Sequence, residues 1–159
     1  MKNGEHHYQA RLVWDGNRGE GTKTYASYGR EYRVVVDSKP ELQGSADPVF
    51  RGDAMRWNPE DLFLASISSC HLLTYLALCA RNGVQVLEYE DRAEGLMKED
   101  GKGGGRFEEV VLRPRVVVAG ADQVDRALEL HTRAHELCFI ANSCSVPIHH
   151  QAEVRSGAG

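Results

Sequence analysis

The stretch NPEDLFLASISSCHLLTYLALCARNG, Asn58 to Gly83, decides the fold. Asn58 is a preferred N-cap residue, and Pro59 suits the first position of a helix. Gly83 is a candidate for a left-handed C-cap, where helices commonly end. From Leu62 to Ala80 no side chain is charged. The sequence therefore predicts one long helix that is apolar on nearly all sides and buried.

A helix of this length could also cross a bilayer, because about 20 apolar residues are enough. The segment is only weakly apolar, however, because it contains serine, cysteine, histidine, threonine and tyrosine side chains. It lies between amphipathic strands, and no second apolar span follows it. We therefore expect a core helix and no membrane partner.

The composition is that of an ordinary globular protein. The chain has 159 residues, of which 42% are apolar and 26% charged, so we expect one domain over residues 1–159. The net charge of −4 does not favour a nucleic-acid partner, because a phosphate backbone requires a basic surface. The N-terminal residues lack the apolar core of a signal peptide, so we expect a cytoplasmic protein.

The segments on either side of the helix alternate like strands. Tyr8, Ala10, Leu12 and Trp14 fall on one face of a half-buried strand. Residues 22–37 are interpreted as two more strands around a Tyr-Gly turn, and residues 37–57 as a long loop. Loops of that length in compact domains are often functional.

The second half of the chain predicts a hairpin, a helix and a final strand. Two long strands, about 84–98 and 106–118, are joined by a glycine-rich turn. Residues 121–138 form a helix with an inward stripe of Val124, Leu128, His131, His135 and Cys138. A short helical turn and a strand over residues 146–154 follow. The order predicts an α+β fold with an antiparallel sheet and helices on one face.

The thiols are the first candidates for chemistry. The four cysteines are Cys70, Cys79, Cys138 and Cys144, and a structural disulfide framework is not expected in a reducing cytosol. Cys79 lies nine residues after Cys70, about 180° around the helix, so the two cannot act together and Cys79 is a core residue. Cys70 is either a small apolar filler beside serines that bond to the helix backbone or a reactive thiol with Cys138 as its partner.

A reactive thiol needs a cation that stabilises its thiolate. Arg51 and Arg56 precede the helix, and Arg18 lies in an earlier turn. Glu60 lies in the first helical turn and could hold an arginine through a two-pronged bond.

NPEDLFLASISSC, together with the later HELCFIANS and VPI, resembles the OsmC/Ohr family of organic hydroperoxide resistance and osmotically induced proteins. The resemblance extends from the RGEGT turn near residue 18 to the final strand. It implies an intertwined homodimer in which antiparallel sheets surround two long central helices. It also implies two active sites at the subunit interface, and no cofactor.

The resemblance also implies the chemistry. Cys70 matches the peroxidatic cysteine, which attacks an organic hydroperoxide and becomes a sulfenic acid. Cys138 matches the resolving cysteine, which forms a disulfide that a lipoyl-type or small dithiol then reduces. Glu60 matches the carboxylate that orients the catalytic arginine, for which Arg51 is preferred and Arg18 is the alternative.

Two residues depart from the family pattern. His71 directly follows the candidate nucleophile. We favour the interpretation that it is a hydrogen-bonded core histidine over the alternative that it tunes the reactivity of Cys70. Cys144 is an additional thiol close in sequence to Cys138. We favour a core role for it over the alternative role of a second disulfide partner.

Two other functions remain open. His131, His135 and Cys138 stand at i, i+4 and i+7 and could bind zinc, in a metal-binding protein or a metal-assisted hydrolase. The same cysteines could instead serve a redox sensor that does not turn over. If the protein is a peroxidase, the apolar residues Leu62, Phe63, Ile67 and Leu73 around Cys70 favour organic hydroperoxides over hydrogen peroxide.

Overall fold

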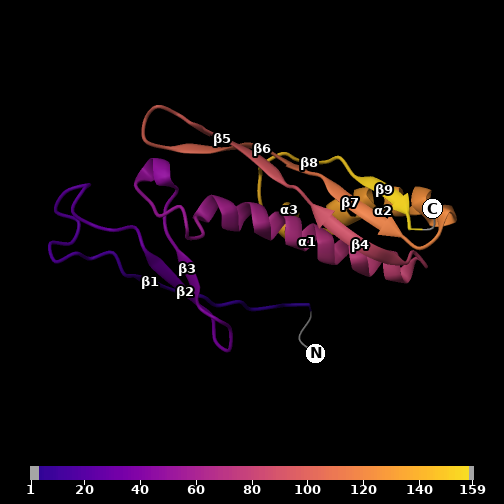
Figure 1. Cartoon of the computed structure of the whole chain (residues 1–159), viewed down its shortest axis with the longest axis horizontal. Helices are drawn as coiled ribbons and strands as arrows, with labels where there is room; N and C mark the ends of the chain where they lie inside the picture. The colour runs from indigo at the N-terminus through magenta and orange to yellow at the C-terminus, as the bar shows by residue number, and fades with distance from the viewer. Residues whose placement is uncertain (1–3, 158–159) are drawn as a thin grey trace. The chain divides into compact units, whose positions relative to one another are not determined.

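The structure is a computed structural model that describes residues 4–157. The chain forms two compact units, the first ending at Leu62 and the second beginning at Phe63 (Figure 1). The single domain expected over residues 1–159 stays a prediction.

The first unit contains a small antiparallel sheet in the order β1-β2-β3. Its strands are β1 (Arg11–Trp14), β2 (Tyr32–Val35) and β3 (Leu42–Gly44). After β3 the chain forms a short 3₁₀ helix, η1 (Pro48–Phe50), and returns to the sheet, where Trp57 bridges Gly44. The segment 37–57, expected to be a loop throughout, therefore contains a strand and a helical turn.

The expected N-terminal strand is shorter and more exposed than its pattern indicated. Tyr8 lies outside the strand and is 89% exposed, and Leu12 within it is 64% exposed. The alternation is present, but most of the apolar face is exposed within residues 4–157, and the Trp14 ring contacts only the edge of the Tyr28 ring among the aromatic side chains. The two strands expected over residues 22–37 are one, because residues up to 28 form turns and only β2 is extended.

The long helix α1 (Pro59–Arg81) begins and ends as expected. Asn58 Oδ1 accepts a hydrogen bond of 2.8 Å from the Asp61 N–H, and the Asn58 N–H donates one of 3.4 Å to the Asp61 carboxylate. These reciprocal bonds form a capping box. Gly83 has a φ of 70°, the left-handed conformation of a C-cap.

In the single chain α1 is buried along one stripe only, so its expected burial on nearly all sides stays a prediction for the dimer. Its buried residues are Ile67, His71, Tyr75 and Cys79, which stand four apart and form one stripe. Other apolar positions face outward, and Leu73 is 66% exposed. By length and hydropathy alone α1 could span a membrane, but its buried stripe belongs to the core of the second unit.

The second unit contains two three-stranded sheets, β4-β7-β9 and β5-β6-β8. The strands are β4 (Val86–Asp91), β5 (Glu94–Glu99), β6 (Gly105–Leu112), β7 (Pro114–Val118), β8 (Ile148–His150) and β9 (Glu153–Ser156). β4–β7 and β5–β6 are antiparallel, as expected. β8 and β9 join in parallel with β6 and β7, so the sheets are mixed.

Each long strand expected from the sequence is broken in its middle. The breaks fall at residues 92–93, at Arg113 and at residues 151–152, and the registers place them side by side. Pro114, which follows one break, has no N–H for a continuous ladder. The three strands therefore change sheets together.

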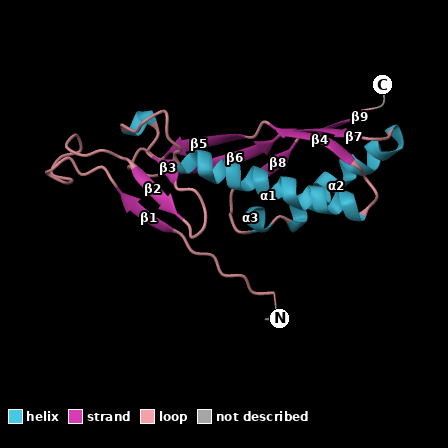
Figure 2. Ribbon diagram, turned by 60° about the horizontal axis from the view of Figure 1, so that its bottom comes forward, coloured by secondary structure: helices cyan, strands magenta, loops and turns pink. Residues whose placement is uncertain are grey.

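The remaining helices confirm the α+β fold. After the 3₁₀ turn η2 (Ala121–Gln123), α2 (Val124–Leu137) lies with α1 on the same side of the strands, as Figure 2 shows. The Tyr75 hydroxyl donates a 3.1 Å hydrogen bond to the Ala127 carbonyl and joins the two helices. The short α3 (Phe139–Asn142) follows as expected. Leu128 of the expected inward stripe is 39% exposed, whereas Leu130 is buried.

Candidate active site

The second unit brings Cys70 and Cys138 together. Cys70 lies on α1 and is half-buried, whereas Cys138 follows α2 and is 1% exposed. Burial raises the pKa of the Cys138 thiol to about 11, and hydrogen bonding and charge interaction with neighbouring Cys70 act in the same direction. Cys138 therefore keeps its proton at neutral pH. Of the two, Cys70 is the more accessible thiol, which suits it to the first attack.

The serines before Cys70 are held in two different ways. The Ser69 hydroxyl donates to the Ser66 carbonyl at 3.3 Å, the bond to the helix backbone that its position indicated. The Ser68 hydroxyl instead donates to the Asp91 carboxylate at 2.5 Å, and Asp91 also accepts from the Arg113 N–H at 2.7 Å. The Ser68 hydroxyl therefore finds its hydrogen-bond acceptor on β4, a contact that the sequence pattern did not reveal.

His71 is a bonded core histidine, as expected. It is 1% exposed, and its Nε2 lies 3.0 Å from Nδ1 of His131, which is 0% exposed. The His131 ring stacks on Tyr75 with 3.8 Å between centroids. Burial lowers the pKa of His71 to about 4 and that of His131 to about 3, and neighbouring imidazoles act in the same direction. Both rings are therefore neutral at pH 7.

The alternative metal-ligand group of His131, His135 and Cys138 does not form. His131 Nδ1 is bonded to His71, and Cys138 is the neighbour of Cys70. Among residues 4–157 no group of three or more histidine, cysteine or acidic side chains is arranged to hold a metal ion. The interpretation of His131, His135 and Cys138 as a metal site therefore has no support in the geometry.

The other two thiols differ from this pair. Cys79 is 1% exposed in the core, as expected, and burial raises its pKa. Cys144 is partly buried, and its thiol donates to the Ala141 carbonyl at 3.6 Å. It packs against the cluster of Ile67, Val110 and Leu112, which agrees with a core role.

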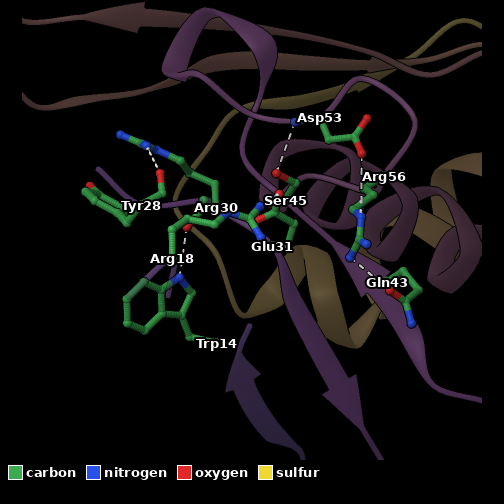
Figure 3. Close-up of polar contacts among 10 residues, drawn as sticks. Trp14, Arg18, Tyr28, Arg30, Glu31, Gln43, Ser45, Asp53 and Arg56 are labelled. Atoms are coloured by element: carbon green, nitrogen blue, oxygen red, sulfur yellow. Dashed lines mark hydrogen bonds and ion pairs between the residues drawn. The ribbon is translucent and has the colours of Figure 1, made fainter. Parts of the chain in front are cut away.

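The candidate arginines lie in the first unit, and only two of them are paired there (Figure 3). Arg18 Nη2 lies 2.6 Å from Glu31 Oε1, and Arg56 Nε lies 3.6 Å from Asp53 Oδ2. Arg51 has a left-handed φ of 65°, and its side chain makes no ion pair within residues 4–157.

Glu60, the carboxylate expected to orient the arginine, also makes no ion pair within the described part of the chain. Burial first, and the charge of Glu60 second, raise the pKa of Tyr32. The sequence did not identify Glu31 as the ion-pair partner of Arg18. The available signal was an acidic residue at the entrance of a strand, just after a Tyr-Gly turn.

Residues 52–153 match the family model described as OsmC-like protein. The chain belongs to the OsmC-like family. The matched range includes Glu60, Cys70 and Cys138, whereas Arg18 and Arg51 lie before it.

Among solved structures, the chain is similar to an OsmC-like protein of unknown function from Vibrio cholerae. The TM-score is 0.84 and the identity 30%, over 94% of this chain and 100% of that one. An organic hydroperoxide resistance protein from Elizabethkingia anophelis, with thiocyanate bound, has a TM-score of 0.66 and 21% identity. That match covers 99% of this chain and 100% of that one, and it bears on the fold alone.

Among curated proteins, the chain is 24% identical over 158 residues to the uncharacterised protein YmaD of Bacillus subtilis. The match covers 96% of this chain and 97% of that protein.

Proposed function

We propose that the protein is a thiol-dependent peroxidase that reduces organic hydroperoxides. One observation carries the proposal: a half-buried thiol, Cys70, lies next to a fully buried thiol, Cys138, whose pKa is raised to about 11. A peroxidase of this kind needs one accessible thiol for the attack and a second thiol beside it, which loses its proton when the disulfide forms.

The reaction balances with these two thiols. The Cys70 thiolate attacks one oxygen of the hydroperoxide, the O–O bond breaks, and the departing alkoxide takes a proton to become the alcohol. Cys70 is then a sulfenic acid. The Cys138 sulfur attacks the Cys70 sulfur, forming a disulfide and releasing water. An external dithiol, of lipoyl type or small, reduces this disulfide by exchange and is itself oxidised.

An arginine completes the proposal by stabilising the Cys70 thiolate. Arg18 and Arg51 are the candidates, and Glu60 is the carboxylate that the resemblance assigns to orient the arginine. Arg51 is the first candidate and Arg18 the alternative; Arg18 is paired with Glu31, and Arg51 makes no ion pair within residues 4–157.

The proposed functional form is a cytoplasmic homodimer. Apolar side chains at Leu73 on α1 and Phe139 on α3 are 66% and 79% exposed in the single chain. A second copy that covers them would remove this apolar surface from water. The apolar residues Phe63, Ile67 and Leu73 of α1 support organic hydroperoxides as substrates in preference to hydrogen peroxide.

A disulfide map by mass spectrometry tests the proposal. We expect one equivalent of cumene hydroperoxide, added to the reduced protein, to link Cys70 with Cys138. The link should be absent in Cys70→Ser and unchanged in the matched control Cys144→Ser. Four thiols that stay reduced would overturn the proposal.

Turnover separates the peroxidase from a redox sensor that uses the same cysteines. With excess dihydrolipoamide we expect continuous consumption of the hydroperoxide, faster than consumption of hydrogen peroxide. A single oxidation without turnover would support the sensor.

A further inference from the structure

The Asp91 carboxylate holds α1 against the strands two residues before Cys70. It accepts a hydrogen bond of 2.5 Å from the Ser68 hydroxyl. We propose that Asp91 is a positioning residue: through Ser68 it sets the rotation of α1 at which the Cys70 sulfur reaches Cys138. The inference deepens the proposed function, on which it rests, and it concerns the step in which the disulfide forms.

The contact between Ser68 and Asp91 is a hydrogen bond from a neutral hydroxyl to a carboxylate. Such bonds are shorter than those between neutral groups and roughly twice as strong. Both residues are partly buried, so water competes with this bond less than it would at the surface. The bond joins α1 to β4, which lie side by side in Figure 1 and Figure 2.

Asp91 is itself fixed from the side of the strands. It is the last residue of β4, and its Oδ1 accepts a hydrogen bond of 2.7 Å from the Arg113 N–H. Arg113 occupies the break between β6 and β7, and Pro114 after it is the register partner of Asp91. One oxygen of the carboxylate therefore binds the line where the strands change sheets, and the other binds α1.

Ser68 and Cys70 lie on nearly opposite sides of α1. Two residues correspond to a turn of about 200° around the helix axis. A rotation of about 20° would move an atom that lies about 5 Å from the axis by about 2 Å. That displacement is about the length of a sulfur–sulfur bond. A small rotation of α1 therefore decides whether the Cys70 sulfur can meet its partner.

Cys138 is enclosed, so the approach depends on where the Cys70 sulfur lies. Cys138 is 1% exposed. Its N–H donates to the His135 carbonyl at 3.4 Å, and its carbonyl accepts from the Asn142 N–H at 3.0 Å. The backbone of Cys138 is thus held on both sides, and it cannot shift freely to follow a displaced Cys70.

A second contact holds α1 from the side of α2. His71 Nε2 lies 3.0 Å from His131 Nδ1, one residue after Cys70. That contact fixes α1 beside α2, whereas the Ser68–Asp91 bond fixes it against the strands. Together they hold α1 from two sides within one turn of Cys70.

The neighbouring serine provides a matched control. The Ser69 hydroxyl donates to the Ser66 carbonyl at 3.3 Å, and this bond stays within α1. Removing the Ser69 hydroxyl therefore deletes a side-chain hydrogen bond next to Cys70 without releasing α1 from the strands.

The experiment follows the closure of the disulfide without peroxide, in the full chain with Cys144→Ser as the reference. One equivalent of dithiobis(nitrobenzoate) is added to the reduced protein. The Cys70 thiolate attacks the reagent, forms a mixed disulfide and releases one thionitrobenzoate. The Cys138 thiol then loses its proton, attacks the Cys70 sulfur and releases the second thionitrobenzoate. The first release reports the reactivity of Cys70, and the second reports its position relative to Cys138; mass spectrometry confirms the link.

We expect Ser68→Ala to slow the second release about tenfold or more, because a misplacement of about 1 Å can cost a hundredfold in rate. The first release should stay within about twofold of the reference. Ser68→Thr keeps the hydroxyl and should restore the second release, and Ser69→Ala should behave like the reference. In an Asp91→Ala chain, adding Ser68→Ala should slow the second release no further, because the two residues act through one bond.

An unchanged second release in Ser68→Ala overturns the inference, and so does an equal slowing in Ser69→Ala. If Ser68→Ala slows both releases equally, or lowers only the melting temperature, the role of the bond is structural and the inference is wrong. A reference protein without a second release also contradicts it, because Cys138 is then out of reach. If both releases occur as expected but cumene hydroperoxide forms no Cys70–Cys138 link, the proposed function fails while the placement of Cys70 by Asp91 stands.

Discussion

The buried pair of His71 and His131 makes the stability of the fold depend on pH. Both imidazoles are neutral in the folded protein because burial lowers the pKa of His71 to about 4 and that of His131 to about 3. In the unfolded chain each returns to the ordinary value of about 6.5. The unfolded chain therefore binds more protons than the folded protein as the pH falls below 6.5.

The difference in pKa between the folded and unfolded states sets the sign and size of the change in the free energy of unfolding with pH. The stabilisation is fully present above pH 6.5 and is lost as the pH falls toward 4, because protons then favour the unfolded chain. At pH 5 an unfolded histidine has bound a proton and a folded one with a pKa of about 4 has not. The free energy of unfolding then falls by about 2 kcal/mol for His71. His131 adds a loss of similar size, so the pair lowers the stability by about 4 kcal/mol at most.

Within residues 4–157, no acidic side chain is among the causes of the pKa shift of either histidine. The rings nearest to the pair are those of Tyr75 and of His150, whose own pKa burial lowers further. His135, close to His150, disfavours a second positive charge there. A proton added to His71 or His131 would therefore place a positive charge beside a neutral tyrosine or another imidazole, and neither stabilises it.

Urea unfolding at pH 7.5 and pH 5.0, at one fixed protein concentration, measures the effect. The fixed concentration matters because a dimer would make the apparent stability depend on it. We expect the wild-type protein to lose several kcal/mol between the two pH values and the His71→Gln/His131→Gln variant to lose much less. His149→Gln, at an exposed position, serves as the control and should behave like the wild type. Equal losses in the wild type and the double variant would refute the reasoning.

Three further predictions follow from single contacts. Asn58→Ala removes the acceptor of the Asp61 N–H at the start of α1 and should lower the free energy of unfolding by about 1 kcal/mol in urea titrations; no change would mean that water replaces the cap. Leu73→Glu puts a charge on an exposed apolar position of α1 and should shift the protein toward monomer in sedimentation velocity runs, whereas an unchanged dimer would exclude this face from the interface. Cys138→Ser removes the buried partner thiol, so peroxide should leave a Cys70 sulfenic acid that dimedone labels, and an unlabelled Cys70 would contradict the order of the two thiols.

The long helix could be predicted from the sequence because its signals are local. Asn58 and Gly83 act within one turn of the helix ends, and both are found as expected. The burial of the helix could not be predicted in the same way, because it depends on what packs against it. An uncharged helix is consistent with burial on all sides by one chain, or with one buried stripe and a second apolar face left for a partner.

The strands illustrate the same limit. Apolar alternation correctly indicated extended segments over residues 84–118, but it did not reveal that they break and change sheets together. The break depends on three strands meeting at one line, and on Pro114 lacking an N–H there. No window of a single strand contains that information.

In the candidate site, too, contacts with local sequence signals were predicted, and contacts made only on folding were not. The pairing of Cys70 with Cys138 was expected because each cysteine occupies a recognisable place, one in a capped apolar helix and one at the end of a second helix. The partner of Arg18 was not expected, because Glu31 reaches it only after three hydrogen bonds close the loop between them. Residues that meet through loop closure leave no periodic signal in the sequence.

The two thiols explain why one helix is both apolar and locally polar. A thiol buried like Cys138 holds its proton, so it is a poor first nucleophile for a peroxide, and in the proposed reaction it loses that proton as the disulfide with Cys70 forms. Cys70 must therefore remain more accessible while lying beside that buried thiol. The Ser68–Asp91 and Ser69–Ser66 bonds satisfy the hydroxyl groups that this position brings into the helix, so the Cys70 thiol interacts with the neighbouring Cys138 and not with these serines.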